Sequence, residues 1–206
     1  MTKLLFIKAS PRGGDSRSVA IAEAYLARLE ARNAGLIVDT IDLWQETLPE
    51  FDGNKANAKL AVITKQTHTR EQKTAWDEIT AIANRFASAD RYLFAVPMWN
   101  GGIPYRLKQY IDIIHQPGLL FGMNPETGYF GLLKDKKATL VYTSGAYAPG
   151  VPPTFGTDHH STYLRAWLNQ AGITDIEEVR FQPTLLSPDP AAGLAQAKSS
   201  AKAMAV

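Results

Sequence analysis

The chain has 206 residues, of which 45% are hydrophobic and 20% are charged, a composition typical of a globular protein and unlike that of a disordered one. Its 22 Lys and Arg residues nearly balance its 20 Asp and Glu residues, and the formal net charge of +2 argues against a nucleic-acid partner. The absence of cysteine excludes disulfides, iron–sulfur clusters, thiolate metal sites and cysteine nucleophiles.

The first predicted elements are a strand, a glycine-containing loop and a helix. Residues 4–9 form a short apolar run, and a cluster of turn-forming residues follows at 10–15. Apolar side chains then recur every three or four positions over residues 16–32, which predicts an amphipathic helix. The serine and glycine residues of the loop therefore stand between a buried strand and a helix N-terminus.

The next segments predict an edge strand, an irregular stretch, a helix and a central strand. Residues 36–41 are apolar apart from Asp39, which is typical of a strand near a sheet edge. Residues 44–59 are polar and include Pro and Gly, so we expect a long irregular surface segment there. Residues 69–72 fit a capping box that starts a helix. The continuously apolar run 92–96 is typical of a strand inside a parallel sheet.

A second unit of strand, loop and helix follows from that central strand. Its loop covers residues 97–103, and we expect Pro104 at the first helical position, where its missing N–H costs nothing. Residues 116–135 are too many for a simple connection and predict a functional excursion. The apolar run 138–142 predicts another strand, which leads into the loop 143–147.

The last part of the chain completes an alternating pattern of strands and helices. We expect a helix from near Asp158 to Gly172, a fifth strand over residues 176–181 and a final helix from Pro190. Five strands that alternate with five helical patterns predict a parallel sheet covered on both faces, because right-handed crossovers place helices there. The expected fold class is therefore α/β, with a three-layer, doubly wound, five-stranded parallel sheet in a single domain over residues 1–206.

Sheets of this kind bind ligands at the carboxyl ends of their strands, so the loops after the first, third and fourth strands are the candidate site. The first loop offers the hydroxyls of Ser10, Ser16 and Ser18 and two glycines beside a helix N-terminus, a set that suits a phosphate monoester. It lacks the lysine of a nucleotide P-loop and the G-x-G-x-x-G pattern of dinucleotide sites. A serine-rich turn with an ordinary helix cap is the alternative interpretation.

The second and third loops add aromatic and amide groups. Met98, Trp99 and Asn100 combine a thioether, a flat ring and an amide that suit the face and edge of a planar heterocycle. The alternative is that Met98 and Trp99 fill the core beneath the next helix. The third loop could donate backbone N–H groups to a carbonyl while Tyr147 covers an open face, although a tight turn after a strand explains it equally well.

Three sets of residues recur together in one known family. They are Ser10, Ser16 and Ser18 around a glycine-containing turn, Pro97-Met98-Trp99-Asn100 followed by Leu107-Lys108-Gln109-Tyr110-Ile111-Asp112, and Lys136-Lys137-Ala138 leading to Thr143-Ser144. Together they resemble the FMN-dependent NADH:azoreductases, which are flavodoxin-like homodimers close to the NAD(P)H quinone reductases. The resemblance covers nearly the whole chain, and the 97–100 loop with its following helix is the most specific part of it.

The resemblance implies a flavodoxin-like FMN-binding domain and assigns residues of all three loops to the cofactor. The implied set is Ser10, Ser16, Arg17 and Ser18 at the phosphate, Pro97, Met98, Trp99, Asn100 and Gly101 at the isoalloxazine and ribityl chain, and Ser144, Gly145, Ala146 and Tyr147 at the pyrimidine side. Relatives commonly have Ser-Arg-Gly-Gly where this chain has Ser144-Gly145-Ala146-Tyr147, and a tyrosine at the position of Trp99. These departures affect the cofactor contacts and the preference for substrate.

The resemblance also implies a reaction in which NADH or NADPH reduces FMN and FMN then reduces a quinone or an azo compound, in a ping-pong sequence. The flavin supplies the chemistry, so we name no catalytic side chain. One alternative is a flavodoxin-type electron carrier without turnover of its own, although such carriers are usually strongly acidic whereas the pI of this chain is about 8.7. The other is a non-catalytic regulatory protein of the same fold.

A homodimer is the expected assembly. Several aromatic residues lie in predicted loops that cannot all be buried beneath one sheet, which favours contacts with a partner subunit. These residues are Phe51, Phe121, Tyr129, Phe130 and Phe155. Packing against other parts of the same chain is the alternative.

The remaining features concern metals and location. Adjacent residues on a helix point about 100° apart, so His159 and His160 cannot readily share a metal ion, and we expect no metal site. The two histidines should form an exposed pair on a first helical turn near the mouth of the site. No apolar run approaches the roughly 20 residues that cross a bilayer. A charge also interrupts the N-terminus too early for a secretory signal, so we expect a cytoplasmic protein without a membrane partner.

Overall fold

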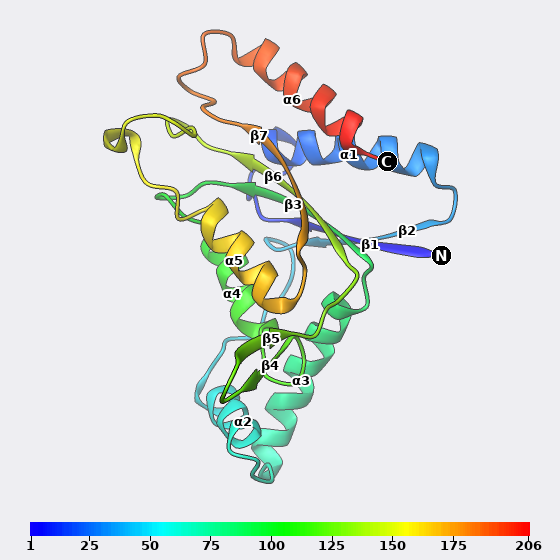
Figure 1. Ribbon diagram of the computed structural model, residues 1–206, viewed down its shortest axis with the longest axis vertical. Coiled ribbons are helices and arrows are strands. Elements are labelled where there is room, and N and C mark those ends of the chain that lie inside the picture. The colour runs from blue at the N-terminus through cyan, green and yellow to red at the C-terminus, as the bar shows by residue number, and fades with distance from the viewer.

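The computed structural model describes residues 1–206 and has a five-stranded parallel sheet between two layers of helices (Figure 1). The strands are β1 (Thr2–Lys8), β2 (Leu36–Asp42), β3 (Arg91–Pro97), β6 (Lys137–Thr143) and β7 (Asp175–Phe181). Their order in the sheet is β2-β1-β3-β6-β7, which places β2 at one edge and reverses the direction of winding between β1 and β3. The predicted doubly wound α/β fold is therefore confirmed.

Helices cover both faces of the sheet (Figure 1). One face carries α1 (Arg17–Arg32) and α6 (Pro190–Met204), and the other carries α3 (Arg70–Ala87), α4 (Tyr105–Ile114) and α5 (Ser161–Ala171). Successive residues of a strand point to opposite faces, so Leu4 and Phe6 pack with α1 and α6, whereas Leu5 and Ile7 pack with the other three helices. Burial on both faces explains why the central strands are continuously apolar.

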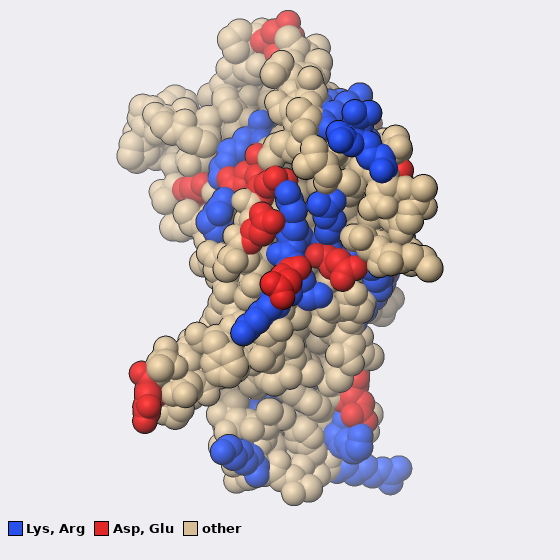
Figure 2. Space-filling view, turned by 45° about the vertical axis from the view of Figure 1, so that its right-hand side comes forward, with Lys and Arg blue, Asp and Glu red and all other residues tan.

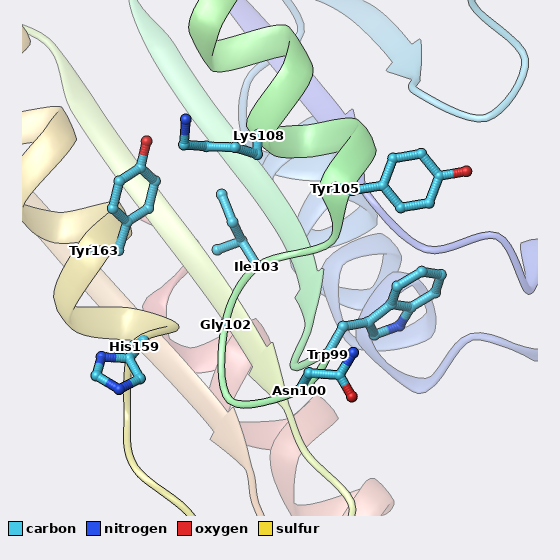
Figure 3. Close-up of a pocket in the computed structure, with 8 residues that line it drawn as sticks. All are labelled: Trp99, Asn100, Gly102, Ile103, Tyr105, Lys108, His159 and Tyr163. Carbon is cyan, nitrogen blue, oxygen red and sulfur yellow. The ribbon is translucent and has the colours of Figure 1, made fainter.

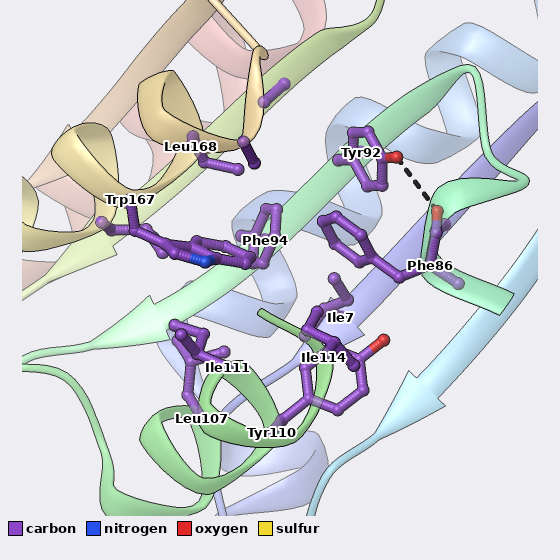
Figure 4. Close-up of a cluster of buried hydrophobic side chains, with 14 of the residues drawn as sticks. Ile7, Phe86, Tyr92, Phe94, Leu107, Tyr110, Ile111, Ile114, Trp167 and Leu168 are labelled. Atoms are coloured by element: carbon purple, nitrogen blue, oxygen red, sulfur yellow. Dashed lines mark hydrogen bonds between the residues drawn. The ribbon is translucent and has the colours of Figure 1, made fainter. Parts of the chain in front are cut away.

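Aromatic side chains fill the core beneath α3, α4 and α5 (Figure 4). The rings of Phe86 and Tyr92 stack with centroids 4.4 Å apart, and the Tyr92 hydroxyl donates to the Phe86 carbonyl at 3.0 Å. Trp167 of α5 meets Phe94 edge-on at 6.2 Å. Such pairs add about 0.5–1.5 kcal/mol each beyond the burial of their area. They form a fixed base beneath the strands whose ends carry the candidate site.

One prediction about the connections is wrong. Part of the stretch 44–59, expected to be irregular, forms α2 (Gly53–Ile63), so the chain has six α-helices rather than five. The Asp52 side chain accepts a hydrogen bond from the Lys55 N–H at 3.0 Å and caps this helix. The helix packs on α3 and buries the small side chains of Ala58 and Ala61. These two alanines form an apolar stripe that is too narrow to stand out in the sequence.

The predicted helix starts are close to those observed. The capping box of α3 is present, with the Thr69 hydroxyl accepting from the Gln72 N–H and the Gln72 side chain accepting from the Thr69 N–H. Pro104 precedes the first helical residue of α4 instead of occupying it. α5 was expected from near Asp158 and begins at Ser161, whose backbone N–H donates to the Asp158 carboxylate.

The excursion at 116–135 contains a hairpin of β4 (Phe121–Asn124) and β5 (Gly128–Gly131), which lies beyond the main sheet and contacts α5 (Figure 1). Phe121 is buried and stacks on His115 at 4.5 Å, so it packs within its own chain. Tyr129 and Phe130 remain exposed. The hairpin is attached to α5 through the Leu133 N–H, which donates to the Ala171 carbonyl at 2.9 Å.

Charges of both signs are distributed over the surface. Figure 2 shows Lys and Arg side chains interspersed with Asp and Glu across the middle of one face. Ion pairs match opposite charges locally, as between Lys137 and Glu177 at 2.7 Å and between Arg85 and Asp39 at 2.7 Å. None of the helices has the length and apolar character needed to cross a membrane.

Candidate functional site

The carboxyl ends of the parallel strands point away from both chain termini and support the candidate site (Figure 1). A cavity of about 420 Å³ opens there between the loops that follow β1, β3, β6 and β7. Its lining residues are Ser10, Arg12, Ser16, Arg17, Pro97, Met98, Trp99, Thr143, Ser144, Gly145, Thr184 and Leu185. The three loops selected from the sequence thus meet in one place, and a fourth loop joins them.

Not every predicted residue lines this cavity. Ser18, Asn100, Gly101, Ala146 and Tyr147 lie outside its lining, whereas the other eight predicted residues are part of it. The sequence analysis did not assign Arg12, Thr143, Thr184 or Leu185 to the cofactor, although Arg12 and Thr143 belong to two of the selected loops. Thr184 and Leu185 follow β7, and the rule that ligands bind at the carboxyl ends of strands was the only signal that could have indicated them.

The loop after β1 is a phosphate-sized cradle at the N-terminus of α1. Ser16 caps the helix, because its side chain accepts from the Val19 N–H at 3.4 Å, and its hydroxyl lies 3.1 Å from that of Ser18. The Ser18 side chain is completely buried, so it supports Ser16 instead of facing the cavity. The backbone N–H groups of Arg17 and Ser18 have no protein acceptor. Free N–H groups and the helix dipole together favour an anion here.

The loops after β6 and β7 are joined through their backbones. The Thr184 N–H donates to the Ser144 carbonyl at 2.8 Å, and the Leu185 N–H donates to the Gly145 carbonyl at 3.0 Å. Arg17 reaches the same segment, with a guanidinium N–H donating to the Thr184 carbonyl at 3.1 Å. A Cβ at position 145 would lie 3.0 Å from a methyl group of Leu185. Leu185 therefore occupies the space beside this glycine.

The loop after β3 contains a tight two-residue turn. Trp99 and Gly102 exchange two backbone hydrogen bonds of 2.8 Å, while Asn100 and Gly101 between them have φ angles of +49° and +80°. Positive φ at both central positions defines a type I′ turn, for which Asn-Gly is a preferred pair. The Gly101 carbonyl also accepts from the His159 N–H at 2.9 Å. Asn100 and Gly101 thus have a conformational role whatever the turn binds.

The loop after β6 contains backbone donors that have no partner within the protein. The N–H groups of Gly145, Ala146 and Tyr147 donate to no protein acceptor. The Ser144 hydroxyl donates to the Tyr147 carbonyl and closes the turn. Three adjacent N–H groups without partners suit a developing negative charge on a bound ligand.

Asp158 fixes the far end of this loop. Its carboxylate accepts from the backbone N–H groups of His160 and Ser161 at 3.0 and 2.7 Å and lies 3.5 Å from the Tyr147 hydroxyl. Burial raises the pKa of Asp158, but the hydrogen bonds from Ser161 and His160 outweigh it and hold the pKa below its usual value. The carboxylate is therefore charged at neutral pH and anchors the start of α5.

A second cavity of about 420 Å³ lies on the other side of the type I′ turn (Figure 3). It is lined by Trp99, Asn100, Gly102, Ile103, Tyr105, Lys108, His159 and Tyr163. Figure 3 shows Lys108 of α4 and Tyr163 of α5 pointing toward one another, and the ammonium group lies 6.0 Å from the ring centroid. Trp99 lines both cavities, so this residue lies between them.

The two adjacent histidines differ in environment, which corrects the expectation of an exposed pair. His159 is exposed and lines the second cavity, whereas His160 is 0% exposed and meets the Tyr142 ring edge-on at 4.6 Å. Burial lowers the pKa of His160 to about 4, so its ring is neutral at pH 7. Both residues precede α5, which begins at Ser161, so the expected first helical turn does not include them. No group of three or more His, Asp or Glu side chains is arranged to hold a metal ion.

Comparisons with known proteins place these features in context. The model of a family described by its flavodoxin-like fold matches residues 2–205. The FMN-dependent NADH:quinone oxidoreductase of Ruegeria pomeroyi is 54% identical over 193 residues, which cover 94% of this chain and 95% of that protein. The protein of the same name from Desulfotalea psychrophila is 41% identical over 185 residues, 90% of this chain and 87% of its own.

A solved structure is similar over the full length as well. It is an FMN-dependent NADH-azoreductase from Bacillus anthracis str. Ames Ancestor in complex with FMN. It superimposes with a TM-score of 0.87 at 28% identity and covers 100% of this chain and 98% of its own. Sequence and structure comparisons therefore agree over the whole described chain.

Proposed function

This chain belongs to the family with a flavodoxin-like fold and is an FMN-dependent oxidoreductase, and we propose that the cavity between Ser10 and Ser144 holds its FMN. The enzyme uses NADH to reduce quinones and azo compounds. When bound there, FMN would supply two-electron transfer from NADH to the acceptor in a ping-pong sequence, with Ser10, Ser16 and Arg17 at its phosphate and Met98 and Trp99 at its ring. The observation that carries the assignment is one cavity with an anion cradle at one end and an indole wall at the other. Its volume lies within the roughly 300–1,000 Å³ typical of cofactor sites.

The donor set at the α1 end fits a phosphate monoester. The hydroxyls of Ser10 and Ser16 line the cavity beside the guanidinium groups of Arg12 and Arg17. The free N–H groups at the start of α1 add two backbone donors, so Ser18 contributes through its backbone and not through its hydroxyl. Charge-assisted hydrogen bonds to a phosphate are stronger than neutral ones. The cradle therefore favours FMN over riboflavin.

The opposite end fits a flat ring with a polar edge. Met98 and Trp99 supply apolar lining, and the loop 145–147, of which Gly145 lines the cavity, carries three N–H groups without a protein acceptor. Preorganised N–H donors would favour negative charge at the pyrimidine edge of a bound flavin. These residues bind and polarise, so no side chain has to act as an acid or base.

We propose that the second cavity, on the other side of Trp99, admits the acceptor. Trp99, Tyr105 and Tyr163 give it aromatic walls that suit a planar quinone or azo compound. Trp99 lines both cavities, so an acceptor in the second cavity would lie beside the flavin site.

Anaerobic stopped-flow spectroscopy tests the function. We expect NADH to bleach the visible absorbance of the FMN holoprotein and a benzoquinone, added next, to restore it. Initial rates measured against NADH concentration, at several fixed concentrations of the benzoquinone, should give parallel double-reciprocal lines. Absorbance that NADH leaves unchanged would contradict the reaction, and bleaching without turnover of the quinone would instead fit an electron carrier.

We also propose a homodimer in the cytoplasm, built from one FMN-binding domain per chain over residues 1–206. Tyr129 and Phe130 on the β4–β5 hairpin are 64% and 50% exposed, and Met123 beside them is 56% exposed. An exposed apolar group of this kind supports a subunit contact, and dependence on NADH supports the location. Sedimentation velocity of the holoprotein should give twice the 22.6 kDa of the chain. A monomer at micromolar concentration would rule the dimer out.

A further inference from the structure

Trp44 stands at the candidate site without lining either cavity. It follows β2, within the segment 44–59 that the sequence marks only as polar. Its backbone N–H donates to the Asp42 side chain at 3.0 Å, which closes a turn at the carboxyl end of this edge strand. The same rim of the sheet carries the cofactor loops, so the turn brings an indole toward them from the side.

The indole of Trp44 contacts the loops after β1 and β3. Its Nε1–H donates to the carbonyl of Ala9 at 3.1 Å, and Ala9 directly precedes Ser10 of the phosphate cradle. Its ring lies 5.5 Å from the ring of Trp99 at an interplanar angle of 45°. One half-buried side chain thus joins the anion end of the cavity to its aromatic wall.

Tyr105 completes an aromatic cluster around this contact. Its ring meets Trp44 edge-on at 5.3 Å and lies 6.2 Å from Trp99. The Trp44 turn is itself held by α4, because Arg106 donates to the Leu43 carbonyl at 2.9 Å and to the Glu46 carbonyl at 2.6 Å. Trp44 is therefore a fixed surface against which Trp99 can rest. The other aromatic neighbour of Trp99 is Tyr105, whose ring is exposed.

We propose that Trp44 is a positioning residue for the flavin site, which holds the indole of Trp99 in the orientation that forms the wall between the two cavities. The inference rests on the proposed function, because Trp99 can only present a wall to FMN if FMN occupies the first cavity. Each aromatic pair contributes beyond its buried area, and the cluster contains two pairs that involve Trp44. Loss of both frees Trp99 to turn into either cavity.

The test compares Trp44→Leu with Trp44→Phe. Leucine keeps apolar bulk but removes the ring and the N–H, and we expect the Kd for FMN to rise about tenfold. The Kd for riboflavin should rise by the same factor, because the contact with Trp99 acts at the ring end; a loss confined to FMN would instead trace to the Nε1–H bond to Ala9 beside the phosphate cradle and overturn the proposal. Phenylalanine restores the ring contacts and should keep both values within about threefold of wild type.

A second readout uses the apoprotein. Two indoles 5.5 Å apart couple their strong far-ultraviolet transitions, so wild type should show a paired far-ultraviolet circular dichroism signal that Trp44→Leu abolishes. Trp76→Leu is the matched control, since Trp76 is also half-buried but lies on α3 beside His68. We expect this control to leave the paired signal and FMN affinity unchanged.

The outcomes separate this inference from the proposed function. If the wild-type protein binds no FMN, the proposed function and the positioning role of Trp44 are both overturned. If wild type binds FMN and Trp44→Leu binds it equally well, only the positioning role of Trp44 is overturned. The same conclusion follows if Trp44→Phe weakens binding as much as Trp44→Leu, because the ring contacts would then contribute nothing.

Discussion

Replacing Arg17 with glutamate is expected to raise the Kd for FMN about 100-fold, while riboflavin affinity changes by less than about fivefold. The guanidinium lines the cavity at the first residue of α1, beside Ser10 and Ser16. A hydrogen bond that involves a charged group contributes about 1.5–3 kcal/mol, and a carboxylate in its place repels a phosphate. Fluorescence titration of the apoprotein with each flavin measures both constants.

The comparison of two flavins separates charge from structure. Arg17 also donates to the Thr184 carbonyl and lies over the Phe181 ring at 5.7 Å, so its loss loosens the loop after β7. That structural effect lowers the affinity for both flavins alike, whereas loss of the phosphate contact lowers the affinity for FMN alone. Arg28→Glu makes the same change of charge on an exposed part of α1 and serves as the control. Equal losses for FMN and riboflavin would show that Arg17 does not bind the phosphate.

Gly131→Ala is expected to lower the free energy of unfolding by about 3 kcal/mol. A Cβ at this position would lie 2.1 Å from the backbone nitrogen of Gly172 and 2.3 Å from the carbonyl carbon of Ala171. These are backbone atoms, which cannot rotate aside as the end of a side chain can. The hairpin would have to leave α5, with loss of the hydrogen bond from Leu133 to Ala171.

Urea unfolding of the apoprotein measures this loss. Gly53→Ala is the matched control, because no atom lies within 4 Å of the added Cβ and the residue starts a helix. We expect the control to change the free energy of unfolding by less than about 0.5 kcal/mol. A change below about 1 kcal/mol for Gly131→Ala would mean that the hairpin moves freely and that the excursion is not part of the packed structure.

The fold could be predicted because its strongest signals are local. The run 92–96 is apolar on both faces, and Thr69 and Gln72 form the capping box that their spacing suggests. α2 was missed because its packing uses two alanines and the stem of Lys55, which give no visible stripe. The hairpin was recognised only as an excursion, since its attachment to α5 depends on two glycines 41 residues apart.

The candidate site was predictable by loop but not by residue. Strand ends fixed which loops would meet, and serine, glycine and aromatic residues indicated the chemistry. Thr184 and Leu185 enter through backbone pairing with the loop at Ser144, a contact that no side-chain pattern reveals. Trp44 was missed for a similar reason, because its partners Ala9 and Trp99 come from distant parts of the chain.

The most direct test is a crystal structure of the protein soaked with FMN. The account predicts a phosphate within hydrogen-bonding distance of Ser10 and Ser16, and a flavin ring against Met98 and Trp99. Its pyrimidine edge should face the free N–H groups of residues 145–147. Density for FMN in the second cavity, or at no place along this rim, would contradict the assignment.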